Sequence, residues 1–163
     1  MNIESIHTTI DSPIGELSLT GVLSADGLTL TSVSFETGEA GSQKAAGFEV
    51  VEKQLDEYFS GERDDFDFAW AAKGTEFQER VWAAVDTVPY GRTTSYGVLA
   101  TQIGASRAQV RAVGAALGAN PLLIIRPCHR VIGATGALTG YAGGLERKHF
   151  LLSHEGALQP QLG

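Results

Sequence analysis

The chain has 163 residues, of which 43% are hydrophobic and 19% are charged, with 20 glycines and a formal net charge of −7. This composition fits a globular protein with a real core, and it excludes a disordered chain, a collagen and a coiled coil. Because Cys128 is the single cysteine, an internal disulfide and a cysteine-rich zinc site are excluded as well. The first residues lack the basic and apolar regions of a signal peptide, so a cytoplasmic protein that uses no metal and enters no membrane is expected.

Charge is distributed unevenly along the chain. Residues 1–73 hold 14 acidic and 4 basic residues, whereas residues 74–149 hold 4 acidic and 8 basic residues. Such an asymmetry is typical of a protein whose basic half faces a polyanion, although an acidic first half would also suit a simply solvated surface. The net charge of the whole chain therefore does not exclude a nucleic-acid partner.

The first half is predicted to form an α/β domain over residues 1–73. Three runs rich in β-formers, separated by turn-forming residues, predict an antiparallel meander: Ile3–Ile10, Leu17–Val22 and Leu28–Phe35. Apolar residues then recur at helical spacing between Phe48 and Phe59, which predicts a helix. The acidic segment Gly61–Gly74 is predicted to be a linker.

The second half, residues 74–163, is predicted to be mostly helical. Thr75 is a candidate N-cap for a helix that continues to about Thr87. Two short helices follow, Thr93–Ile103 and Ser106–Ala119, and the spacing of Ser106 and Gln109 suits a capping box. Two helices around a glycine-containing turn are typical of a helix-turn-helix, although two packed helices that bind no DNA would give the same pattern.

The last third contains a short apolar run and a glycine-rich stretch. Leu122–Ile125 is predicted to be a short buried strand that leads into Cys128. The stretch Gly133–Gly144 lacks the motifs of a phosphate-binding loop and is predicted to be a flexible loop or wing. A final helix from Glu146 to about His154 is predicted to pack Phe150, Leu151 and Leu152 inward.

Cys128 has basic neighbours in the sequence. A lone cysteine is more often a buried core residue than a nucleophile. However, Arg126, His129 and Arg130 surround this cysteine, and positive charge stabilises a thiolate, so a lowered thiol pKa is expected. Glu155 would orient His129 in a Cys-His-Glu relay, or it would be an ordinary acid at a helix end.

The run Pro127–Gly133, Pro-Cys-His-Arg-Val-Ile-Gly, resembles the active-site signature of the O6-alkylguanine-DNA alkyltransferases. Further blocks are similar to that family in the same order: Gly74–Gln78, Val81–Trp82, Pro89–Gly91, Ser95–Gly97, Arg111–Gly114, Asn120–Pro121, Thr139–Leu145 and His154–Gly156. Residues 1–73 resemble the family only in length and in a Ser-Pro-Ile-Gly turn. The resemblance implies an α+β two-domain fold, with a ribonuclease H-like domain over residues 1–73 and a winged helix-turn-helix domain over residues 74–163 that binds DNA and transfers the alkyl group.

The resemblance implies direct-reversal repair of O6-alkylguanine, and of O4-alkylthymine, in double-stranded DNA without a cofactor. Cys128 would accept the alkyl group irreversibly, in a single turnover, after the damaged base has been flipped out of the duplex. His129, oriented by Glu155, would remove the thiol proton through a water molecule. The protein would act as a monomer through the minor groove, and cooperative binding along DNA is left open.

The resemblance also implies which residues hold the base and the DNA. Tyr96 would assist extrusion and donate to guanine N3, the Val131 and Cys128 carbonyls would accept from the exocyclic amine, and Tyr141 and the Ala142 N–H would face the base. Asn120 would tie the helix-turn-helix to the active-site strand. The implied DNA contacts come from the helix-turn-helix: Ser106, Arg111, Ala112 and Ala115.

Two of these assignments have plain alternatives. Arg111 would fill the gap in the base stack, or it would be one more phosphate contact. The alanines of its helix would enter the narrow minor groove, or they would simply allow close helix packing.

Arg126 departs from the resemblance, because the family usually has an aliphatic residue before Pro-Cys-His-Arg. A cation there would lower the thiol pKa further, contact DNA or narrow the pocket. Two rival functions are compatible with part of this pattern. A helix-turn-helix protein that only binds lesions or regulates transcription, with Cys128 as a sensor, would share these motifs. A cysteine hydrolase is disfavoured because no acyl-transfer motif surrounds Cys128.

Overall fold

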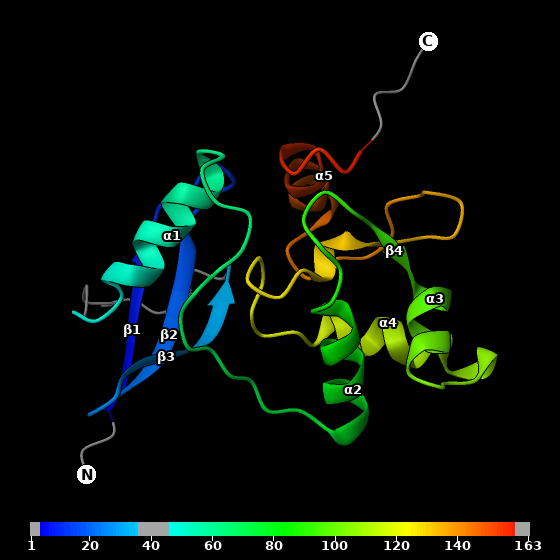
Figure 1. The fold of residues 1–163 in the computed structure, drawn as a ribbon, viewed down its shortest axis with the longest axis horizontal. Helices are drawn as coiled ribbons and strands as arrows, with labels where there is room; N and C mark the ends of the chain where they lie inside the picture. Colours follow the sequence, from blue (N-terminus) through cyan, green and yellow to red (C-terminus); the bar gives the residue numbers. More distant parts are fainter. Residues whose placement is uncertain (1–3, 36–45, 159–163) are drawn as a thin grey trace. The chain divides into compact units, whose positions relative to one another are not determined.

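The computed structural model describes residues 4–35 and 46–158, and the chain divides into two compact units, Met1–Ala72 and Lys73–Gly163. The structure is a mixed α/β arrangement with a small antiparallel sheet and several helices (Figure 1). In the part of the chain that is described, no helix is both long and apolar enough to span a bilayer.

The first unit contains a three-stranded antiparallel sheet in the order β1-β2-β3, formed by β1 (Glu4–Ile10), β2 (Leu17–Ser24) and β3 (Gly27–Ser34). Leu17 and Leu19 alternate with half-buried polar residues, which is why one face of β2 enters the core. The helix α1 (Glu49–Phe59) lies alongside the sheet and buries Val51, Leu55 and Tyr58 (Figure 1). The predicted strands and helix are confirmed to within two residues.

The predicted linker over Gly61–Gly74 is wrong for much of its length. Its last residues pair with the edge of β3, because Leu30 donates to the Ala69 carbonyl at 2.9 Å and accepts from the Ala71 N–H at 2.9 Å. The Gln54 side chain also makes hydrogen bonds of 3.0 and 2.7 Å with the backbone of Asp67. These contacts hold the segment against the first unit. Its acidic composition could not predict them, because the partners, β3 and Gln54, lie elsewhere in the chain.

The second unit is built around three helices that pack together: α2 (Glu76–Val85), α3 (Tyr96–Gln102) and α4 (Val110–Gly118). The predicted caps are present at Thr75 and at Ser106, whose N–H donates to Gln109 Oε1 at 2.8 Å, and α3 has a cap at Ser95 that was not predicted from the sequence. Gln78 and Thr75 form a reciprocal capping box with hydrogen bonds of 3.1 and 2.9 Å, and Ser95 accepts from the Val98 N–H at 3.1 Å. The helix predicted over Ser106–Ala119 begins as a short 3-10 turn, η1 (Arg107–Gln109), before α4.

The predicted strand over Leu122–Ile125 is wrong. These residues are buried, but Leu122 forms only an isolated bridge, residues 123–125 form a turn, and Ile124 has a φ of +72°. The strand in this region is β5 (Val131–Ile132), which follows the short 3-10 turn η2 (Cys128–Arg130) and pairs in parallel with β4 (Thr94–Ser95). A short apolar run indicates burial without indicating its backbone conformation, which explains the error.

The last helix, α5 (Leu145–His154), buries Leu151 and Leu152 as predicted, but Phe150 is 37% exposed and stacks on His154. The inner face of α5 is completed instead by Lys148, which is three and four residues before these leucines and fully buried.

Candidate active site

Cys128 lies in the wall of a pocket of about 470 Å³ in the second unit. The pocket is formed by α3, by α4 and by the loop that precedes α5, and its lining residues are Tyr96, Gly114, Leu117, Gly118, Cys128, Thr139, Gly140, Tyr141 and Ala142. Four residues singled out from the sequence therefore meet here: Tyr96, Cys128, Tyr141 and Ala142. Val131 and Asn120 are buried outside this lining.

The expectation that Cys128 has a lowered pKa is wrong. The side chain is 5% exposed, and burial raises the pKa of the Cys128 thiol to about 12 even though Arg126 opposes the shift. The basic neighbours act weakly because their charges are paired: Arg130 binds Glu155 and Arg126 binds Asp86. Cys128 is thus a protonated thiol at neutral pH and needs a base to become a nucleophile.

His129, Arg130 and Glu155 form a buried hydrogen-bonded cluster beside this cysteine. The Glu155 carboxylate accepts from His129 Nε2 at 2.8 Å and from Arg130 Nε at 2.7 Å, and Arg130 also donates to the Val88 carbonyl at 2.7 Å. Burial alone would raise the pKa of Glu155, but the hydrogen bonds from His129 and Arg130 outweigh it and hold that pKa at about 2. Glu155 is therefore an anion.

The protonation of His129 follows from this cluster. Burial lowers the pKa of His129 below its usual value of 6.5, so the imidazole is neutral at pH 7. Its one ring proton resides on Nε2, since Nε2 faces the Glu155 carboxylate. Nδ1 makes no hydrogen bond with any described residue and is left as a proton acceptor.

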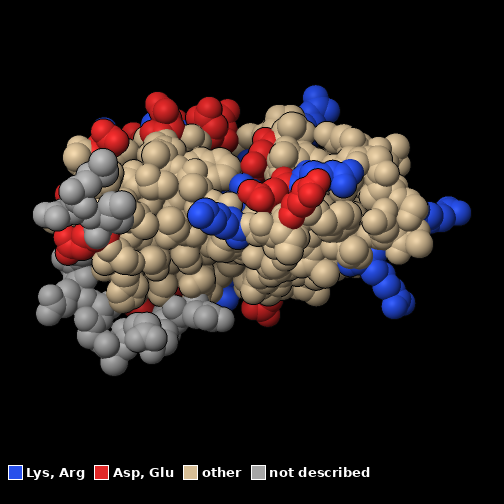
Figure 2. Space-filling view, turned by 90° about the horizontal axis from the view of Figure 1, so that it is seen from below, with Lys and Arg blue, Asp and Glu red and all other residues tan. Residues whose placement is uncertain are grey.

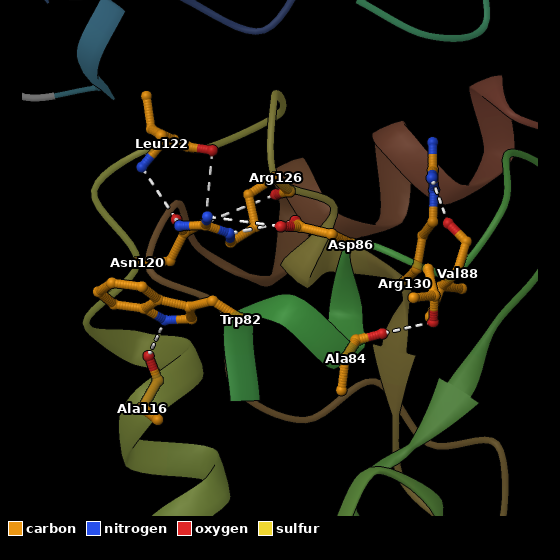
Figure 3. Close-up of polar contacts among 10 residues, drawn as sticks. Trp82, Ala84, Asp86, Val88, Ala116, Asn120, Leu122, Arg126 and Arg130 are labelled. Carbon is orange, nitrogen blue, oxygen red and sulfur yellow. Dashed lines mark hydrogen bonds and ion pairs between the residues drawn. The ribbon is translucent and has the colours of Figure 1, made fainter. Parts of the chain in front are cut away.

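Asn120 braces the turn that carries Cys128 (Figure 3). Its Oδ1 accepts from the Leu122 N–H at 3.0 Å, and its Nδ2 lies 3.4 Å from the Leu122 carbonyl and 3.5 Å from the Arg126 carbonyl. The Arg126 carbonyl in turn accepts from the Cys128 N–H at 2.8 Å. Asn120 follows directly on the C-cap of α4, so it connects that helix to the cysteine.

Lys148 is a site residue that sequence reasoning missed. Its Nζ donates to the carbonyls of Thr139 and Gly140 at 2.8 and 3.0 Å, and the Tyr96 hydroxyl donates to the same Thr139 carbonyl at 2.8 Å. Burial lowers the pKa of Lys148 to about 8. The two side chains hold the loop that forms one wall of the pocket. The helical spacing of Lys148 with Leu151 and Leu152 was the signal that could have identified it.

The helix α4 has two different faces. Val113, Ala116 and Leu117 are buried, whereas the residues expected to meet DNA are exposed: Ser106, Arg111, Ala112 and Ala115. Gly118 and Ala119 continue this exposed face. The helix therefore presents small side chains and one arginine to solvent. Elsewhere in the described residues, no three His, Cys, Asp or Glu side chains gather where they could hold a metal ion.

Comparison with known proteins gives matches over both units. Residues 6–71 match the 6-O-methylguanine DNA methyltransferase ribonuclease-like domain, and residues 76–157 match the DNA-binding domain of the same family. A methylated-DNA–protein-cysteine methyltransferase of Mycolicibacterium paratuberculosis is 49% identical over 153 residues, which cover 91% of each chain.

Solved structures agree with this assignment. The crystal structure of the Mycobacterium tuberculosis O6-methylguanine methyltransferase superposes with a TM-score of 0.83 at 45% identity, covering 96% of each chain. The structure of the Mycobacterium tuberculosis protein in complex with DNA gives a TM-score of 0.81 at 47% identity, covering 93% of this chain and 92% of that one. With matches across both units and a close relative over nearly its full length, the chain belongs to the 6-O-methylguanine DNA methyltransferase family.

Proposed function

We propose that this protein repairs O6-alkylguanine in double-stranded DNA by transferring the alkyl group irreversibly to Cys128. One observation carries the proposal: the single cysteine of the chain lines a pocket together with Tyr96, Tyr141 and Ala142. The family is named for this chemistry, and a relative has been crystallised with DNA. O4-alkylthymine is the second substrate that we assign to the same pocket.

The chemistry is a displacement at the alkyl carbon. The sulfur of Cys128 forms the new bond to carbon as the carbon–oxygen bond to guanine breaks, and the electron pair of that bond returns to the base. His129 Nδ1 takes the thiol proton through a water molecule, because Nε2 is committed to Glu155. Glu155 stabilises the imidazolium that results, as the acid of a catalytic triad does. The thioether is not hydrolysed, so each molecule reacts once.

The damaged base must leave the duplex to reach Cys128, since the cysteine is buried in a pocket wall and the target oxygen is stacked inside DNA. In the proposed complex Tyr141 packs against the flipped base, the Ala142 N–H faces O6, and the Tyr96 hydroxyl gives up its hydrogen bond to the Thr139 carbonyl and donates to N3. Donors at O6 and N3 stabilise the charge that develops on the leaving base. The Val131 and Cys128 carbonyls accept from the exocyclic amine.

DNA is held by a winged helix-turn-helix over residues 74–163, in which α3 and α4 are the two helices and the loop 133–144 is the wing. The small exposed face of α4 enters the minor groove, and Arg111 fills the space of the flipped base. The degenerate pattern of that groove suits a protein that must find lesions in any sequence. Residues 1–73 form the ribonuclease H-like domain.

Mass spectrometry tests the proposal directly. The protein is mixed with an equimolar duplex that carries one O6-methylguanine, and the intact protein and its peptides are weighed. We expect one added methyl group, on the Cys128 peptide, with equal loss of the lesion from the DNA. A duplex with O4-methylthymine tests the second substrate in the same way.

Cys128→Ala is the control, and it should bind the lesion duplex without changing it. If wild-type protein binds the lesion but Cys128 stays unmodified, the proposal is wrong and the binding-only function is supported. A methyl group found on any other residue would also refute the role given to Cys128.

A further inference from the structure

The charged side chain of Arg126 is buried, two residues before the buried Cys128, and is paired with Asp86. Its Nε donates to Asp86 Oδ1 at 3.1 Å and its Nη2 to Asp86 Oδ2 at 3.5 Å, so the carboxylate is held by two contacts. The guanidinium carbon also lies 4.8 Å from the centre of the Trp82 ring (Figure 3). Trp82 lies in α2 and Asp86 is the C-cap of that helix, one helical turn later. The carboxylate and the aromatic ring therefore face the same guanidinium.

One role expected for Arg126 from the sequence is supported, because its charge lowers the pKa of Cys128, although burial of the thiol has the larger and opposite effect. The other two expected roles, contact with DNA and narrowing of the pocket, do not match its position between Asp86 and Trp82. The side chain is 8% exposed, which keeps it from reaching phosphates, and it does not line the pocket. Its charge is already met by Asp86 within the protein. The contacts of the Arg126 side chain are therefore made within the protein, with Asp86 and Trp82.

The backbone of Arg126 carries the turn that presents Cys128. Its N–H donates to the Leu122 carbonyl at 2.9 Å, and its carbonyl accepts from the Cys128 N–H at 2.8 Å. Trp82, which contacts the Arg126 guanidinium, is also bound to α4, because its Nε1 donates to the Ala116 carbonyl at 2.8 Å. Arg126 thus connects α2 to the turn that leads to Cys128, and Trp82 connects α2 to α4 through the hydrogen bond to Ala116 drawn in Figure 3.

We propose that Asp86 and Arg126, seated on Trp82, are a positioning pair that holds the Leu122–Cys128 turn and aims Cys128 for alkyl transfer. The pair touches neither DNA nor the base. It acts through the backbone of Arg126 and through Arg126 Nη1, which lies 3.5 Å from the Oδ1 of Asn120. The inference rests on the proposed role of Cys128 and assigns that site two supporting residues.

The two members of the pair are buried to different extents, and this difference predicts unequal effects. The Arg126 side chain is almost inaccessible, whereas the Asp86 side chain is 30% exposed. Removing Asp86 leaves a guanidinium buried without its partner, whereas removing Arg126 leaves a carboxylate that water can reach. Removing both leaves an apolar contact, which is often as stable as the ion pair it replaces.

The decisive experiment is a double-mutant cycle on methyl transfer, with Asp86→Leu, Arg126→Ile and the double variant in full-length protein. Single-turnover rates are measured against protein concentration, and the reacting fraction is counted from the methylated Cys128. We expect Asp86→Leu to lower the saturating rate by about tenfold or more, because small displacements of a reacting group are costly, and Arg126→Ile to lower it less. The double variant should return to within about threefold of wild type.

The concentration that gives half the saturating rate should change by less than about twofold in every variant, since the pair does not contact DNA. Glu57→Gln is the matched control: it breaks an Arg63–Glu57 pair with the same 3.1 Å Nε–carboxylate distance in the first unit, and it should change nothing. Additive losses in the double variant, or losses confined to the half-saturating concentration, would overturn the proposal. Asp86→Asn keeps the side-chain size if Asp86→Leu folds poorly.

Alkylation of Cys128 by iodoacetamide without DNA gives a second readout. Arg126, Asp86 and Lys148 are the charged groups that act on the thiol, and Asn120 is its polar neighbour: Arg126, Lys148 and Asn120 lower the pKa of Cys128, and Asp86 raises it. At fixed pH, Asp86→Leu should therefore raise the alkylation rate and Arg126→Ile should lower it, each by about twofold or more. Simple loosening of the fold would raise both rates and would contradict the proposal.

This second readout also separates the two proposals. If wild-type Cys128 is never methylated by lesion DNA, the proposed function fails, but the opposite shifts in iodoacetamide alkylation still decide whether the pair acts on the cysteine.

Discussion

Glu155 determines the protonation of the groups around Cys128. Its carboxylate receives hydrogen bonds from His129 and Arg130, and all three side chains are buried. An acid in this position stays ionised, keeps the histidine proton on Nε2 and takes up the charge of a neighbouring arginine. The same residue therefore leaves His129 Nδ1 without a proton and pairs with Arg130, a cation that would otherwise favour the thiolate.

This cluster makes the stability of the second unit depend on pH. The pKa of Glu155 in the folded protein is about 2, below its usual value of 4.5, so its contribution is complete above pH 4.5 and is lost as the pH falls towards 2. The pKa of His129 is also lowered, so the unfolded chain takes up a proton below pH 6.5 while the folded protein stays neutral. We expect the free energy of unfolding to fall steadily from pH 6.5 to pH 2.

Glu155 should account for at most about 3 kcal/mol of this loss. Urea unfolding followed by the fluorescence of Trp82 in a Trp70→Phe background measures it. Glu155→Gln should flatten the curve between pH 4.5 and 2, and Glu57→Gln should leave its slope unchanged. A stability that is constant over this range would show that the cluster does not hold Glu155 ionised.

Helix α4 has one face that packs in the core and another that meets DNA in the proposed complex. Its buried face consists of Val113, Ala116 and Leu117, and its exposed face consists of residues no larger than alanine apart from Arg111. The small size of these exposed residues is not required for stability, because substitutions on an exposed surface usually change the free energy of unfolding very little. Small side chains matter where a binding partner must approach the helix closely, as the walls of the narrow minor groove of DNA would.

Ala115→Leu tests this interpretation. We expect it to weaken binding to undamaged duplex DNA by about tenfold, about 1.4 kcal/mol, because the branched side chain keeps α4 out of the groove. The free energy of unfolding should be unchanged. The measurements are a binding titration and urea unfolding. Ala83→Leu, which enlarges an exposed alanine on α2, is the matched control and should affect neither; equal DNA affinity in both variants would refute the minor-groove placement of α4.

At the scale of the whole molecule, the difference in charge between the two units is smaller when only exposed residues are counted than when all residues are counted. Three of the basic residues of the second unit, Arg126, Arg130 and Lys148, are buried and engaged within the protein. The exposed arginines are Arg80, Arg92, Arg107 and Arg111. Figure 2 shows red acidic side chains over both units and blue basic ones projecting from the second.

Few exposed cations predict a shallow salt dependence of DNA binding. With four exposed arginines and the exposed Lys73 in the second unit, the slope of log affinity against log salt concentration should be about −4.5 or shallower, since each neutralised phosphate contributes about −0.9. Binding titrations across a range of salt concentrations measure it. Arg107→Ala should reduce the slope by about one, whereas Arg63→Ala in the first unit should leave it unchanged. A much steeper slope would mean that DNA also contacts cations outside this set.

Local features of this protein could be predicted from the sequence. Strands β1 to β3, helices α2 and α3, the caps at Thr75 and Ser106, and the signature around Cys128 follow from residues that are neighbours in the chain, which is why their patterns were informative. The turn at Leu122–Ile125 could not be predicted, because an apolar run of four residues indicates burial in either a strand or a turn.

The electrostatics of the site were decided only by the tertiary structure. Arg126 and Arg130 stand next to Cys128 in the sequence, but their charges are met by Asp86 and by Glu155, which lie 40 and 25 residues away from them. Burial of the thiol and the pairing of both arginines turned an expected acidic cysteine into one that depends on a base. The sequence determined which groups this protein has for its chemistry, whereas only folding determined which of their charges act on Cys128, because charge pairing and burial depend on distance in space.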